Sequence, residues 1–181
     1  MALMMMAVAG FAQIPTAGNV FAGATANSAA SGWGKAGNLS GWEVSVEGKV
    51  APYVGIVGDL GQEYGWLQTP GQYLFGGTAT VPTHTRIVTI LAGPRVSVNV
   101  GRFRPFAQAL IGAAHLHQNL QQYAAAYSYG ETSMGDAVGG GVDYRLQRFV
   151  GLRAQGDLVQ TRFRGSRQND FRFAIGVVLK F

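Results

Sequence analysis

Three histidines are the side chains in this sequence best suited to acid–base chemistry or metal binding. His115 and His117 are separated by one residue, and in an extended strand that spacing places both imidazoles on one face. Such a pair could chelate a metal, or supply the base of a Ser/His/acid set with Glu131 or Glu63 as the orienting acid. However, no third ligand is evident, His84 lies on a different predicted strand, and no His-x-Ser arrangement is present. We favour polar rim residues beside lipid headgroups, and we predict no catalytic residue, metal site or cofactor.

Charged residues are scarce and scattered along the chain. They make up 13% of the 181 residues, with a net charge of +5, whereas a soluble domain usually carries about 25% charge. The basic residues gather only in a small group at Arg162, Arg164 and Arg167, so we do not expect nucleic acid as a partner. The chain has no cysteine, which excludes disulfides and thiolate metal sites.

The apolar content points away from helices and towards strands. Hydrophobic residues make up 48% of the chain, yet no run of roughly 18 apolar residues could form a transmembrane helix. Two classes therefore remain: a buried all-β protein, or a barrel that spans lipid with strands.

Alternation of apolar and polar residues dominates the chain. Between Trp42 and Val50, apolar or small residues alternate with polar and charged ones, and the last eleven residues carry a large apolar side chain at every second position up to Phe181. That last stripe has the length of a tilted strand that crosses a bilayer. The same pattern predicts eight strands, near residues 18–27, 42–51, 53–65, 83–97, 105–117, 135–146, 149–163 and 170–181.

The predicted connections differ in length in a regular way. Residues 28–41, 66–82, 118–134 and 164–169 are longer connections rich in Gly, Ser, Asn, Gln and Tyr, whereas those near 52 and 147–148 are tight and the one at 98–104 is intermediate. Outer-membrane barrels combine short periplasmic turns with longer outer loops. An even number of strands then predicts that both termini are periplasmic.

The charged residues on the polar faces of the strands indicate whether the apolar faces point into a core or out to lipid. In a soluble, lipocalin-like barrel the charged residues would point outwards, whereas in a membrane barrel of eight strands they would point inwards and pair. These charged residues are nearly balanced in charge, as an internal network requires. The apolar face ends on Phe181, whose ring would be unfavourable on a surface exposed to water. We predict an inward network of Glu43, Glu47, Lys49, Asp59, Arg95, Asp143, Arg145, Arg153, Asp157 and Arg172, with Lys180 on the same polar faces.

The end of the chain resembles a known family. The terminal run GVVLKF matches the C-terminal signal of outer-membrane barrels at Gly176, Leu179 and Phe181, although Ala174 stands where that signal usually has a polar residue. The segments GGGVDYR (139–145) and LRAQGD (152–157) resemble the small outer-membrane β-barrel domain family, which is similar to the transmembrane part of outer-membrane protein A. The resemblance covers residues 18–181. It implies residence in the envelope and recognition by the barrel assembly machinery, and it implies no reaction.

The first residues have the pattern of a targeting segment. Met1 to Phe11 is an apolar run, and small residues precede Gln13 at the two positions that a signal peptidase inspects. We expect a signal peptide at 1–12, without the usual basic start, and a barrel domain at 13–181. A buried N-terminal strand or helix is the alternative.

Together these patterns predict an all-β, eight-stranded antiparallel transmembrane up-and-down barrel of the bacterial outer membrane. We expect a non-enzymatic structural or surface-interaction role, with the charged network plugging the lumen. The alternatives are a rim enzyme that modifies lipid A, as deacylase or acyltransferase, and a narrow ion-conducting pore. Expected partners are outer-membrane lipids and lipopolysaccharide. The loop tyrosines Tyr123, Tyr127 and Tyr129 are candidates for contact with an outer ligand.

Overall fold

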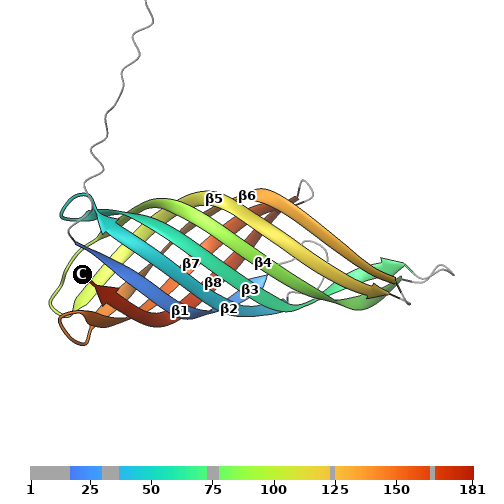
Figure 1. Ribbon diagram of the computed structural model, residues 1–181, viewed down its shortest axis with the longest axis horizontal. Helices are drawn as coiled ribbons and strands as arrows, with labels where there is room; N and C mark the ends of the chain where they lie inside the picture. Colours follow the sequence, from blue (N-terminus) through green and yellow to red (C-terminus); the bar gives the residue numbers. More distant parts are fainter. Residues whose placement is uncertain (1–16, 30–36, 73–77, 123–124, 164–165) are drawn as a thin grey trace, which may run out of the picture.

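The protein is a single closed barrel of eight antiparallel strands (Figure 1). The computed structural model describes residues 17–29, 37–72, 78–122, 125–163 and 166–181. Each strand pairs with its neighbours in the sequence, and β1 pairs with β8 to close the sheet. The strands are β1 Gly18–Ala29, β2 Gly37–Lys49, β3 Val54–Gln72, β4 Thr78–Ser97, β5 Phe103–Gln122, β6 Ala125–Arg145, β7 Val150–Phe163 and β8 Ser166–Lys180.

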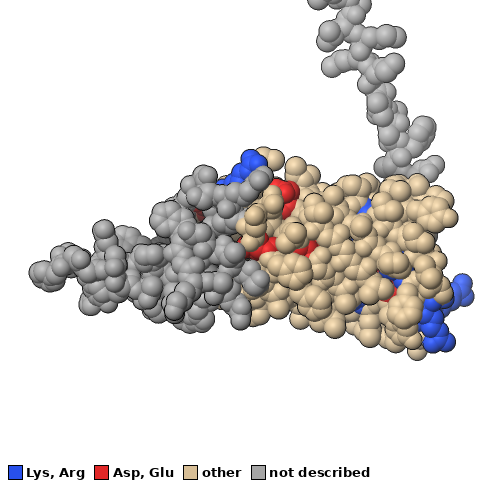
Figure 2. All heavy atoms as spheres, turned by 180° about the vertical axis from the view of Figure 1, so that it is seen from behind, with Lys and Arg blue, Asp and Glu red and all other residues tan. Residues whose placement is uncertain are grey.

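The predicted fold class is therefore confirmed, and so is the direction of the two faces. Leu152 and Phe181 point outwards and are 45% and 60% exposed, whereas Glu43 and Glu47 are fully buried inside. Large apolar side chains are exposed on every strand from β2 to β8, whereas most charged residues of the same segments are buried. Figure 2 shows the result from one side, where uncharged residues cover most of the described wall. In the part of the chain that the structure describes, no helix is long and apolar enough to cross a membrane.

Four strands are much longer than predicted, because segments 66–82 and 118–134 are mostly strand and not loop. β3 runs to Gln72 and β4 starts at Thr78, while β5 runs to Gln122 and β6 starts at Ala125. Segments 28–41 and 164–169 also give residues to strands, since β1 ends at Ala29, β2 starts at Gly37 and β8 starts at Ser166. In these extensions apolar residues are few and irregularly spaced, so the sequence there carries no period-two signal.

The short turns lie at one end of the barrel, together with the C-terminus and the start of β1 (Figure 1). The turn after β2 is closed by the Val50 N–H donating to the Val54 carbonyl at 3.1 Å, and that after β6 by the Leu146 N–H donating to the Val150 carbonyl at 3.1 Å. In the turn between β4 and β5, Gly101 has a φ of 61°, a left-handed conformation that favours glycine. We call this the turn end, and the opposite one the hairpin end.

The closure between β1 and β8 depends on two glycines that face each other. Gly23 pairs with Gly176, and both lie on the inward side of the seam. A Cβ on Gly23 would lie 2.5 Å from the Phe21 ring and 2.6 Å from the Ile175 carbonyl oxygen, while one on Gly176 would overlap the Ala22 carbonyl oxygen. Since the obstacle at Gly176 is backbone, no side-chain movement can relieve it.

We expect Gly176→Ala to weaken the barrel by about 1–3 kcal/mol, the usual cost of overpacking. Gly58→Ala is the matched control, because its Cβ would meet nothing within 4 Å, and we expect it to change stability by less than about 0.5 kcal/mol. Urea unfolding of both variants in detergent, followed by tryptophan fluorescence, measures the difference. Equal midpoints would show that the seam does not need the glycine.

Candidate functional site

The interior of the barrel holds a connected network of charged side chains. Of the residues predicted to point inwards, eight are at most 3% exposed, and they come from six of the eight strands: Glu43, Glu47, Asp59, Arg95, Asp143, Arg153, Asp157 and Arg172. Lys49 lies at the turn end and is only partly buried. Burying so many charges is tolerable only if they pair and hydrogen-bond with good geometry.

Glu47 is the centre of the network near the turn end. One carboxylate oxygen accepts from Arg104 at 2.5 Å and lies 3.2 Å from Lys49 Nζ, while the other lies 3.2 Å from Arg95 Nη1. The Asn19 amide also donates to this second oxygen, at 2.8 Å. One carboxylate from β2 thus ties together β1, β4 and β5.

Asp143 is the second carboxylate of this region, and its main partner is Arg153. The guanidinium donates to both oxygens, at 2.6 and 3.1 Å, a bidentate arrangement that fixes its plane. The same group lies over the Phe21 and Phe106 rings, 5.0 and 4.8 Å from their centroids. The two rings occupy the space beside Arg153, so packing and ion pairing act on the same side chain.

Further from the turn end, acidic side chains outnumber basic ones. Arg172 is surrounded by Glu43 at 3.4 Å, Asp59 at 3.3 Å and Asp157 at 3.6 Å. Glu63 is buried beyond them, where it accepts from the Asn27 amide at 2.7 Å. Arg172 is the only arginine or lysine that forms a described ion pair with these acids.

Gln108 joins the basic region to the acidic one, and Gln155 links two of the acids. The Gln108 oxygen accepts from Arg95 at 2.6 and 3.0 Å, while its nitrogen donates to Asp157 at 2.8 Å. The Gln155 nitrogen donates to Glu43 at 2.6 Å and to Asp157 at 3.1 Å. An amide has both an acceptor and a donor end, so Gln108 can face a cation and a carboxylate at once, while Gln155 uses its donor end for two carboxylates.

Sequence reasoning missed Arg104, Gln108 and Asn19. The alternation pattern places Arg104 in the connection 98–104, whereas β5 already starts at Phe103. The alternation of Arg104, Phe106, Gln108 and Leu110, all buried, is the signal that indicates an inward face. That signal is obscured because Phe103, Pro105, Ala107 and Ala109 make the other face apolar as well.

Arg145 does not join the inward network, contrary to the prediction. Its side chain is exposed and donates to the Gly101 carbonyl at 2.9 Å. It is the last residue of β6, where the strand leaves the barrel wall and alternation no longer determines the direction of a side chain.

His115 and the two acids proposed to orient it lie on different faces of the barrel wall. His115 is exposed on the outer wall, with Nδ1 2.8 Å from Thr132 Oγ1. Glu63 points into the lumen, and Glu131 is paired in register with Leu116, whose side chain is buried. Within the described ranges, no group of three or more histidine or acidic side chains could hold a metal ion.

Two of the three tyrosines predicted to lie in a loop belong to a strand. Tyr127 and Tyr129 belong to β6, paired with Leu120 and Gln118 of β5, because this hairpin extends further than expected. Their side chains and the whole of Tyr123 lie outside the described residues.

Comparison with solved structures places this architecture among outer-membrane barrels. The attachment invasion locus protein Ail of Yersinia pestis superposes with a TM-score of 0.67 at 13% identity, over 91% of this chain and 98% of that one. The Neisserial surface protein A superposes with a TM-score of 0.69 at 16% identity, over 91% and 99%. The fold is that of the small outer-membrane barrels.

A third match is a major outer membrane protein of Thermus thermophilus, with a TM-score of 0.57 at 13% identity, over 91% of this chain and 99% of that one. Ail has also been crystallised in complex with the heparin analogue sucrose octasulfate. No family model and no curated protein matches the sequence. At these identities the likeness establishes the fold alone.

We expect Arg172→Met to destabilise the protein by about 3–5 kcal/mol, the usual cost of removing one partner from a buried ion pair. The reason is that Glu43, Asp59 and Asp157 would lose the cation they share. Arg145→Met removes an exposed arginine and should cost less than about 0.5 kcal/mol. Equal urea midpoints for the two variants would show that the ion pairs contribute little.

Proposed function

We propose that this chain is a non-enzymatic integral protein of the bacterial outer membrane, with a structural or surface-interaction role. The observation that carries this proposal is the direction of the two faces. Leu152, Ile111 and Val138 are exposed on the wall, while Arg153 and Asp143 are buried behind it. Such a surface is unfavourable in water and suited to hydrocarbon.

We propose that the network closes the lumen. An eight-stranded barrel has an interior that side chains can fill. Here ion pairs and amides extend from Lys49 through Glu47, Arg95, Gln108 and Asp157 to Arg172. Buried apolar side chains occupy further space, among them Val57, Leu91, Leu110 and Val159. This arrangement favours a plug over an ion-conducting pore.

The wall offers contacts to lipid at both edges of the apolar band. Trp42 and Tyr64 are exposed at the edge of the apolar band that faces the hairpin end, with the Trp42 indole N–H donating to the Tyr64 hydroxyl at 3.4 Å. Tyr53, Phe103 and Phe149 are exposed at the turn end. Aromatic girdles of this kind lie at headgroup level, so phospholipid and lipopolysaccharide are the partners we propose for the wall.

The turn end is then periplasmic, with both termini, and the hairpin end is outside. Gly176, Leu179 and Phe181 would be recognised by the barrel assembly machinery. The signal peptide at 1–12 remains a prediction, since it lies outside the described residues. The hairpin end, with Tyr123, Tyr127 and Tyr129, is the part we propose to meet an outer ligand. Ail, a barrel of similar fold, has been crystallised with the heparin analogue sucrose octasulfate.

Membrane residence is tested by heat-modifiability. We expect the chain to fractionate with the outer membrane and to migrate differently on a gel before and after boiling, because a closed barrel resists detergent until it is heated. A single band at one position in both lanes, or recovery only in the soluble fraction, would contradict the proposal.

The plug is tested by planar-bilayer recording of the refolded protein. We expect no stepwise conductance, because the charged side chains pair with one another across the lumen. Reproducible unit conductance of the unaltered protein would overturn the plug and support the pore.

A further inference from the structure

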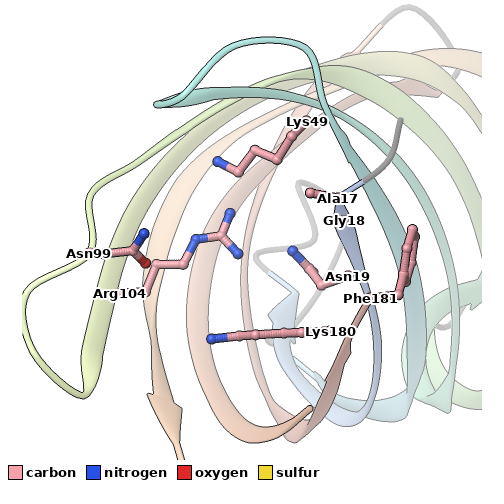
Figure 3. Close-up of a pocket in the computed structure, with 8 residues that line it drawn as sticks. All are labelled: Ala17, Gly18, Asn19, Lys49, Asn99, Arg104, Lys180 and Phe181. Carbon is pink, nitrogen blue, oxygen red and sulfur yellow. The ribbon is translucent and has the colours of Figure 1, made fainter. Parts of the chain in front are cut away.

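A cavity of about 190 Å³ opens at the turn end of the lumen, and its lining is cationic. Lys49 of β2, Arg104 of β5 and Lys180 of β8 extend into it from three sides (Figure 3). Asn19 and Asn99 add amide groups, and the Phe181 ring forms part of the rim (Figure 3). All three cations thus converge on one small space that is open to solvent.

The acids around this cavity are too few for its cations. Five basic side chains, Lys49, Arg95, Arg104, Arg153 and Lys180, surround the turn end of the lumen, and their described ion pairs involve only Glu47 and Asp143. Lys180 has no described ion pair or hydrogen bond with any of the residues that the structure covers. The acidic side chains around the cavity therefore leave part of its positive charge without an ion pair.

The acids deeper in the lumen do not supply the missing charge. Glu43, Asp59 and Asp157 are already grouped around Arg172. Between them and the cavity lies the neutral amide of Gln108, which accepts from Arg95 and donates to Asp157, while the Gln155 amide donates to Glu43 and Asp157. The basic and acidic halves are thus separate, and the excess positive charge faces outwards at the turn end.

We propose that this cavity binds a phosphate group, with Lys180 as the side chain that contacts it directly and Lys49 and Arg104 beside it. A phosphate monoester carries close to two negative charges and three acceptor oxygens at neutral pH, which matches several convergent donors better than the single charge of a carboxylate. Lysine acts as a mobile point charge on phosphate, and arginine as a rigid fork. This site is distinct from the hairpin-end surface proposed above.

The phosphate could belong to a lipid headgroup or to a soluble molecule. The cavity lies beside Phe181, at the same end as the exposed Tyr53 and Phe149 rings, so lipid headgroups would be near its rim. Both sources share the chemistry that the cavity recognises, and the experiment separates them.

The test compares Lys180→Met with Arg148→Gln in the refolded full chain. Lys180 occupies the free position of the terminal signal, between Leu179 and Phe181, so its replacement leaves that signal intact. Arg148 is exposed on the turn after β6, where it lies over the Phe149 ring at 5.3 Å, so its loss removes one charge from the same end without altering the cavity. Lys180→Arg keeps the charge and shows whether the site tolerates a change of shape.

Binding of inorganic phosphate and of glycerol phosphate is measured by calorimetry, first in uncharged detergent and then in phosphatidylcholine vesicles with or without phosphatidic acid. We expect saturable phosphate binding that Lys180→Met weakens about tenfold, as the loss of a charged hydrogen bond would, while Arg148→Gln and Lys180→Arg retain it. Weaker binding in the vesicles that contain phosphatidic acid would identify a lipid as the source, because the lipid then competes for the cavity. Equal binding in both kinds of vesicle would indicate that the natural ligand is a soluble phosphate compound.

Absence of saturable phosphate binding in detergent and in both kinds of vesicle would overturn the proposal. So would an equal loss in Lys180→Met and Arg148→Gln, because that result indicates general charge attraction. Gel migration before and after boiling verifies that each variant is folded, and Lys180→Gln replaces Lys180→Met if the latter fails to fold.

Discussion

Pairing of buried charge is the constraint on which the rest of this structure depends. Alternation in the strands sends one set of side chains to lipid and the other into a space that water scarcely enters, and the second set contains most of the chain's acids. Charges in such a place are stable only when each has partners in good geometry. The register of the sheet supplies those partners, since Arg172 of β8 reaches Glu43 of β2 and Asp59 of β3.

The charge of the network changes along the barrel axis. Basic side chains gather within a few residues of the short turns, around Glu47 and Asp143, whereas acids gather around Arg172. Gln108 joins the two parts because an amide can face a cation with one end and a carboxylate with the other. The barrel therefore presents a positive cavity at the end where the chain closes.

The sequence is informative wherever lipid touches one face of a strand. There the contrast between Trp42 and Glu43, or between Leu152 and Arg153, predicts both the strands and the direction of their side chains. The prediction fails where that contrast disappears. This happens in the hairpins beyond the apolar band, and at the start of β5, where the sequence pattern assigns Arg104 to a connection.

The partners of the buried polar side chains cannot be predicted from the sequence. They depend on the register between each pair of neighbouring strands around the closed barrel. No local pattern places Gln155 beside Glu43, more than a hundred residues away. Likewise, the sequence predicts Gly176 as part of an assembly signal, and its close approach to Ala22 at the seam is evident only in three dimensions.

The central claim, that hydrocarbon covers the apolar face, is measured most directly with nitroxide labels on single cysteines, which the cysteine-free sequence makes simple to introduce. Labels replacing Ile111, Leu152 and Val177 on the wall, and Arg148 on the turn as an aqueous reference, report collisions with oxygen and with a water-soluble nickel chelate in vesicles. The account predicts high oxygen and low nickel access at the three wall positions and the reverse at Arg148. Wall labels that nickel reaches as easily as it reaches the turn would contradict it.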